Sequence, residues 1–105
     1  MTIRLKWRHR EAFLKSYKNR YKNVRFLVTE SCTLWQALKE RMPNAKISVG
    51  ISNIYINKQP YPLNQELKTF MRNEDRYIMH GKGISPKLGT FIIDTISKSS
   101  VCAPI

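Results

Sequence analysis

The sequence predicts a single small α+β domain, on three observations. The chain has 105 residues, 42% of them are hydrophobic, and segments with strand-like alternation stand on both sides of one strongly amphipathic helical segment. A chain of this length forms about one domain with one modest core, and its hydrophobic content is too high for a disordered polymer. We expect the domain to span residues 1–96 and a C-terminal tail to follow at 97–105.

Apolar and basic residues are interleaved over the first quarter of the chain. Residues 2–8 alternate between the two kinds, which predicts a half-buried strand with its apolar face on Ile3, Leu5 and Trp7. Residues 9–23 are a basic insertion, in which aromatic side chains four residues apart would share one face of a short helix: Phe13, Tyr17 and Tyr21. Residues 24–29 alternate again, which predicts a second strand.

The clearest helix signal lies at residues 32–42. Leu34, Leu38 and Met42 are one helical turn apart and form an apolar stripe. Hydroxyl and carboxylate side chains precede this stripe as capping candidates, and Pro43 follows it as a helix breaker. We therefore expect one main helix at 32–42.

The segment after the main helix is rich in strand-forming residues. Residues 47–56 contain many β-branched side chains and lead into Asn57-Lys58, a candidate tight turn because asparagine tolerates the left-handed conformation. Residues 61–63 would then form a short edge strand, since prolines flank it.

The last third of the chain predicts one short helical segment and one more strand. Leu63, Leu67 and Phe70 are spaced to pack a helical or turn segment under the sheet. Residues 77–79 are expected to form a strand that enters a glycine-rich chain reversal at 81–83, and residues 91–96 form a further apolar segment.

This order of elements predicts a β-grasp (ubiquitin-like) domain, with a mixed sheet packed on the main helix at 32–42. The resemblance extends to particular residues. The run Ile54-Tyr55-Ile56-Asn57-Lys58-Gln59-Pro60, the pair Leu63 and Leu67, and the run Asp75-Arg76-Tyr77-Ile78-Met79-His80-Gly81 resemble the closing half of a doublecortin domain. The resemblance covers roughly residues 2–88. It implies microtubule binding, because doublecortin domains are basic modules that dock between tubulin protofilaments, and it implies a cytoplasmic, cytoskeletal location.

The charge balance independently indicates an acidic partner. The chain has 19 lysines and arginines against 7 acidic residues, a formal net charge of +12. Such an excess favours association with an anionic surface. The densest cationic cluster is the predicted docking patch, which comprises Arg8, Arg10, Lys15, Lys18, Arg20, Lys22 and Arg25.

Charge alone leaves two further partner classes open. The chain is alternatively a structural RNA-binding protein of a ribonucleoprotein, such as the ribosome of a mitochondrion or other organelle, in which the basic residues neutralise phosphates. Tyr17 and Tyr21 could then stack on unpaired bases. The third hypothesis is a small accessory subunit of another large assembly, with an apolar face at 91–96.

The sequence does not predict catalysis, a cofactor or a metal site. Cys32 precedes the main helix and His80 could partner it, but the domain is small for a protease cleft and no third orienting group is evident. Cys32 and Cys102 have no metal or redox spacing, so we expect two reduced thiols. No apolar run approaches the roughly 20 residues that span a bilayer.

Overall fold

The computed structural model describes residues 1–22 and 26–93 and shows an α+β fold. Its three α-helices are α1 (Trp7–Lys18), α2 (Thr33–Arg41) and α3 (Gln65–His80), and short 3-10 helices occur at η1 (Arg20–Lys22) and η2 (Val28–Glu30). The strands are β1 (Thr2–Arg4), β2 (Ile47–Val49), β3 (Asn53–Ile56), β4 (Gln59–Pro62) and β5 (Thr90–Ile92). Within the described residues, no helix is both long and apolar enough to cross a membrane.

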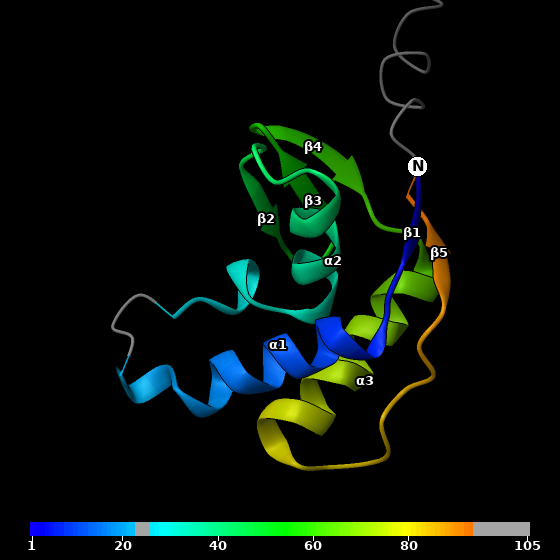
Figure 1. The fold of residues 1–105 in the computed structure, drawn as a ribbon. Coiled ribbons are helices and arrows are strands. Elements are labelled where there is room, and N and C mark those ends of the chain that lie inside the picture. The colour runs from blue at the N-terminus through cyan, green and yellow to red at the C-terminus, as the bar shows by residue number, and fades with distance from the viewer. Residues whose placement is uncertain (23–25, 94–105) are drawn as a thin grey trace, which may run out of the picture.

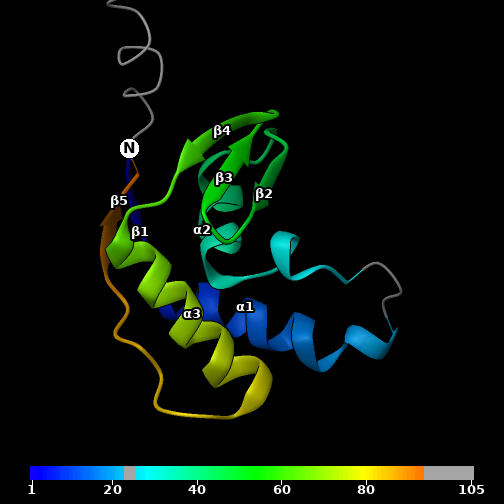
Figure 2. The same ribbon diagram turned by 180° about the vertical axis from the view of Figure 1, so that it is seen from behind.

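The strands form two separate antiparallel sheets. In the first, β1 pairs with β5, and Ile3 lies opposite Phe91, so the two ends of the described chain are side by side. The second has the order β2-β3-β4. Helix α2 lies between α1 and this three-stranded sheet, while α3 crosses behind α1 (Figures 1 and 2).

The β-grasp topology expected from the sequence is not shown by this arrangement, which has two small sheets in place of one mixed sheet. The prediction of a strand at 77–79 is wrong, because these residues lie in the last turn of α3. Leu67, Phe70, Glu74 and Ile78 are all buried on α3, and this helical spacing overrides the local strand preference of Tyr77-Ile78-Met79. Gly81 then ends the helix in the left-handed conformation, with φ 61°.

The N-terminal part of the chain also differs from expectation. The strand predicted at 2–8 ends at Arg4, and Trp7 begins α1 with 60% of its surface exposed. The helix begins here because the Lys6 backbone N–H donates to His9 Nδ1 at 2.9 Å, which satisfies one of the free amides at the helix start. Of the strand predicted at 24–29, residues 26–27 are irregular and Val28 and Thr29 belong to η2, while 24–25 lie outside the described residues.

Other local predictions are confirmed. Helix α2 occupies 33–41 of the expected 32–42, and β3 and β4 form a hairpin at the expected turn, although β4 covers 59–62 in place of 61–63. The segment 47–56, expected as one strand, is divided into β2 and β3, which pair with each other. Its two-residue turn, Asn57-Lys58, has φ 51° and 71°, the positive values that a type I′ turn requires at both positions. Pro60 and Pro62 lie in the edge strand β4, where a missing N–H is tolerated.

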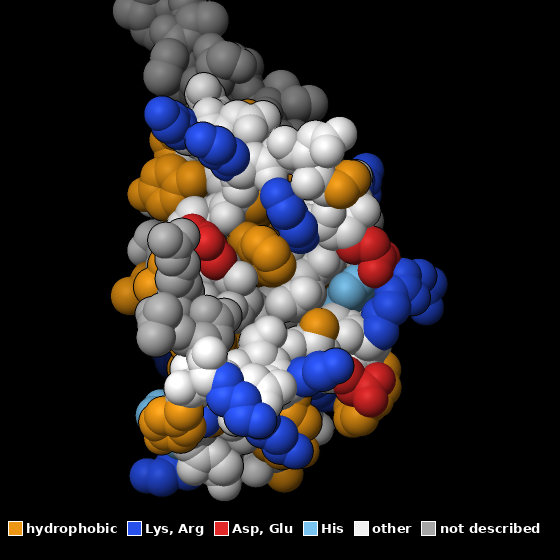
Figure 3. Space-filling model, turned by 60° about the vertical axis from the view of Figure 1, so that its left-hand side comes forward, with side chains coloured by type: hydrophobic (Ala, Val, Ile, Leu, Met, Phe, Trp, Pro, Cys, Tyr) orange, Lys and Arg blue, Asp and Glu red, His pale blue; other side chains and the backbone are white. Residues whose placement is uncertain are grey.

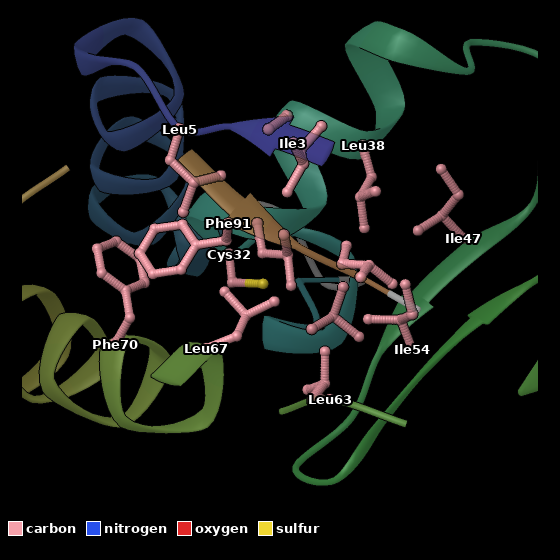
Figure 4. Close-up of a cluster of buried hydrophobic side chains, with 14 of the residues drawn as sticks. Ile3, Leu5, Cys32, Leu38, Ile47, Ile54, Leu63, Leu67, Phe70 and Phe91 are labelled. Carbon is pink, nitrogen blue, oxygen red and sulfur yellow. The ribbon is translucent and has the colours of Figure 1, made fainter. Parts of the chain in front are cut away.

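The core is formed by side chains from all three α-helices and both sheets (Figure 4). Phe13 of α1 is fully buried, so the segment expected as a basic insertion contributes to the core. Phe70 of α3 packs on Phe91 of β5 with ring centroids 5.1 Å apart. Burial of side chains of this size stabilises a fold by about 2–3 kcal/mol each. The predicted tail at 97–105 lies outside the described residues.

Candidate functional site

The residues of the predicted basic patch have different environments in the structure, and Arg10 is buried. Its guanidinium is buried and donates to Glu74 through Nε (2.8 Å to Oε2) and Nη2 (2.7 Å to Oε1). Nη2 also donates to the backbone oxygen of Pro86, and the Thr33 hydroxyl donates to Glu74 at 2.6 Å. The pair therefore connects α1, α2, α3 and the loop after α3. Arg10 belongs to the interior and is not part of a docking surface.

Arg8 is exposed but already has an acidic partner. Its Nε and Nη2 donate to the two carboxylate oxygens of Glu40 on α2, at 2.8 and 2.6 Å. His9 Nδ1 accepts the Lys6 amide, so the ring proton is on Nε2, which faces Glu40 Oε2 at 3.2 Å. These two partners lower the pKa of Glu40 to about 2. Because Glu40 offsets its charge, Arg8 contributes little to a cationic surface.

The remaining cations of the patch lie together at the C-terminal end of α1. We define the α1 tip as Lys15, Lys18, Arg20, Tyr21 and Lys22. Its three lysines are exposed, and within the described part of the chain ion pairs involve other cations, namely Arg8, His9 and Arg10. Arg25, the last residue of the predicted patch, lies outside the described residues.

Arg20 is held in place by two tyrosines. Its Cζ lies 3.8 Å from the ring centroid of Tyr17 and 4.3 Å from that of Tyr21, a double cation–π contact. Nη1 donates to the Tyr17 backbone oxygen and Nη2 to the Tyr21 hydroxyl. The Tyr17 hydroxyl donates to the Met79 backbone oxygen, which fixes Tyr17 to α3. Tyr21 remains 83% exposed, so its ring is accessible to a binding partner and lies beside the guanidinium of Arg20.

Figure 3 shows how the charge is distributed over one face. Lysine and arginine side chains form several groups with acidic side chains between them, and they do not form one continuous basic field. On this face a partner would meet local clusters of charge, and the α1 tip is one cluster whose cations form none of the ion pairs among the described residues.

A second feature is a groove of about 700 Å³ between α3, η2 and the start of the β2–β3 connection. Three of its lining residues are cations spaced four residues apart on α3: Lys68, Arg72 and Arg76. This row was not among the binding residues predicted from the sequence. The four-residue spacing of these cations is present in the sequence. Because a strand was expected at 77–79, however, the three cations were not assigned to one helix.

The groove also contains both members of the cysteine–histidine pair considered for catalysis. Cys32 and His80 line it. Burial raises the pKa of the Cys32 thiol to about 12, so the sulfur is protonated at neutral pH and is a poor nucleophile. Cys102 lies outside the described residues. Among the residues with described positions, no three His, Cys, Asp or Glu side chains cluster as metal ligands would.

Asp75, which also lines the groove, gives a pH-dependent prediction. Burial, and then the neighbouring Glu74 carboxylate, raise its pKa to about 6 from 3.8. The folded state therefore binds this proton more tightly than the unfolded state, and the group's stabilising effect is lost as pH rises from about 4 to about 6. Asp75→Asn should raise the free energy of unfolding above pH 6, because it removes a partly buried negative charge that lies next to Glu74. We expect a gain of only about 1 kcal/mol, since partial contact with solvent screens the charge.

Urea unfolding at two pH values tests this expectation. The gain from Asp75→Asn should shrink toward zero near pH 3, below both the folded pKa of about 6 and the ordinary value of 3.8, because the carboxyl is then mostly protonated in the folded and the unfolded states. Glu66→Gln, a change of an exposed acid in the first turn of the same helix, is the control and should show no such gain. An Asp75→Asn effect that is equal at both pH values would contradict the assignment.

Comparison of the chain with known family models, with characterised proteins and with solved structures finds no match.

Proposed function

We propose that this chain is a non-catalytic basic binding module and that the α1 tip binds RNA. The observation that carries the proposal is the exposed Tyr21 ring, fixed beside Arg20 and among three exposed lysines. Single-stranded nucleic acids are bound by this combination, in which cations contact phosphates and aromatic rings stack on bases. The other parts of the sequence-derived patch are less suitable, because Arg8 and Arg10 already have carboxylate partners.

The microtubule lattice is the second candidate partner. It is supported by the net charge of +12 and by the β3–β4 hairpin, which lies at residues that resemble a doublecortin domain. We rank it below RNA because a tubulin surface offers carboxylates but no unpaired bases, so it gives the Tyr21 ring no specific role. Location follows the partner: the cytoplasm and cytoskeleton for tubulin, or an organellar or cytoplasmic ribonucleoprotein for RNA.

One binding experiment separates these partners. The protein is titrated against a short, labelled, uridine-rich single strand, and is sedimented separately with stabilised microtubules with and without unlabelled RNA. We expect saturable RNA binding, and pelleting that RNA abolishes. Tyr21→Ala should weaken RNA binding by about tenfold, the effect of losing one stacked base.

Tyr77→Ala is the matched control, since Tyr77 is 38% exposed on α3 and is not in the α1 tip. It should leave the affinity for RNA unchanged. Pelleting with microtubules that resists RNA would favour tubulin in place of RNA. An equal loss in both tyrosine variants would show that Tyr21 has no specific stacking role.

A further inference from the structure

The groove on α3 combines an apolar floor with a basic side. Its apolar lining includes Val28 of η2, Val49 of β2 and Met71 of α3. The cations at 68, 72 and 76 lie on the helical wall, and Asp75 is the acidic residue among the described lining residues. Figure 2 shows the elements around it, with α3 in front, the β2–β3 hairpin above and the short cyan turn of η2 beside them. The described lining residues of the groove thus include three lysine or arginine side chains and one carboxylate.

Ile51 shows that the described residues leave one apolar edge of the groove uncovered. It lines the groove from the β2–β3 connection and is 90% exposed. A fully exposed isoleucine is common by itself, but one beside an apolar groove extends a continuous apolar surface. Such surfaces, with charged residues along one side, are typical of sites that bind a partner protein.

We propose that this groove docks an acidic amphipathic helix of a partner protein. The apolar face of such a helix would lie on the floor and against Ile51, and its acidic flank would lie along the row of Lys68, Arg72 and Arg76. Helix-in-groove binding has this form, with apolar anchors three and four residues apart. RNA fits the groove less well, because none of its described lining residues is Phe, Tyr or Trp. The one ring among them, His80, lies at the C-terminal end of α3, and the floor is formed by aliphatic side chains.

The groove and the α1 tip share no residue, so they are two separate surfaces. Protein binding in the groove would leave Tyr21 and the exposed lysines free for RNA. This arrangement gives the chain two separate surfaces, as a component that joins an acidic protein to a nucleic acid would need. The inference does not depend on the proposed RNA function, and the test below contains an RNA arm that distinguishes them.

The test uses the whole chain and two labelled synthetic helical peptides. The first has leucines three and four residues apart on one face and glutamates beside them; the second is identical but has serine in place of each leucine. Fluorescence anisotropy should show binding of the first peptide and at least about a tenfold loss for the second, because apolar anchors contribute most of the energy at such interfaces.

Matched variants of the protein locate the site. Ile51→Ser and Arg72→Gln should each weaken binding of the leucine peptide by about fivefold to tenfold. Their controls are Ile84→Ser, at a side chain that is 87% exposed, and Arg4→Gln on β1, neither of which lines the groove. The controls remove the same side chain or charge and should change the affinity by less than about twofold.

Three results would overturn the proposal. Equal losses in Arg72→Gln and Arg4→Gln would show attraction to net charge alone. Unchanged affinity in Ile51→Ser would show that the apolar surface does not contact the peptide. Displacement of the peptide by a single-stranded RNA would place the peptide on the RNA-binding surface, whereas simultaneous binding supports two sites and leaves the RNA proposal to its own test.

Discussion

Replacing Glu74 by Gln is expected to lower the free energy of unfolding by about 3–5 kcal/mol. The substitution keeps the size of the side chain but removes its charge, and this leaves the buried Arg10 guanidinium without a carboxylate. It also weakens the hydrogen bond that the Thr33 hydroxyl donates to Glu74. Single domains have unfolding free energies of about 5–15 kcal/mol, so this change removes a large part of the total. Urea unfolding followed by circular dichroism measures it.

The chain contains its own control for this experiment. Arg8 and Glu40 form a bidentate pair of similar geometry two residues earlier on α1, but both side chains are about half exposed. Water can replace either partner there, so Glu40→Gln should have a far smaller effect on stability. Comparable losses for Glu74→Gln and Glu40→Gln would contradict the role assigned to burial.

A double replacement separates the strength of the pair from the penalty of breaking it. Arg10→Met with Glu74→Leu removes both charges and keeps apolar volume in their place. Buried ion pairs replaced in this way often lose little stability. We therefore expect the double variant to recover most of the loss seen in Glu74→Gln. A double variant as unstable as the single one would show that the remaining contacts, to Thr33 and Pro86, require the charges.

The contrast between Arg8 and Arg10 shows what the sequence could not supply. Both arginines lie in the same basic run, and charge alone placed both in one docking patch. Their different roles depend on partners far along the chain: Glu40 is 32 residues from Arg8, and Glu74 is 64 residues from Arg10. Without an indication of which segments pack together, a basic run appears as a uniform surface.

The elements that were predictable from the sequence are those determined locally. The main helix has its own apolar stripe and breaker, and the Asn57-Lys58 turn has residues suited to positive φ. By contrast, the helix predicted from the sequence was shorter than α3, because Tyr77-Ile78-Met79 has the local composition of a strand. Only the spacing of buried residues from Leu67 to Ile78 shows one continuous helix. The groove was missed for the same reason, since the position of its cationic row depends on α3.

The α1 tip allows a quantitative prediction for RNA binding. Each phosphate contact to a single strand contributes about 0.7 to the slope of log affinity against log salt concentration. Replacing Lys15, Lys18 and Lys22 together by Gln should therefore reduce this slope by about 2. It should weaken binding by about a hundredfold at 0.1 M salt. All three side chains are exposed, so the fold should be retained, as a urea unfolding curve would verify.

The control variant replaces three other exposed lysines, Lys46, Lys82 and Lys87, by Gln. It lowers the net charge by the same amount. If the α1 tip is the contact surface, the control keeps nearly the native salt slope, because counterions are released only where phosphates meet cations. Similar reductions of slope in both triple variants would mean that RNA binds diffusely to the charge of the whole molecule. A slope that is unchanged in the α1 tip variant would move the contact to another surface of the chain.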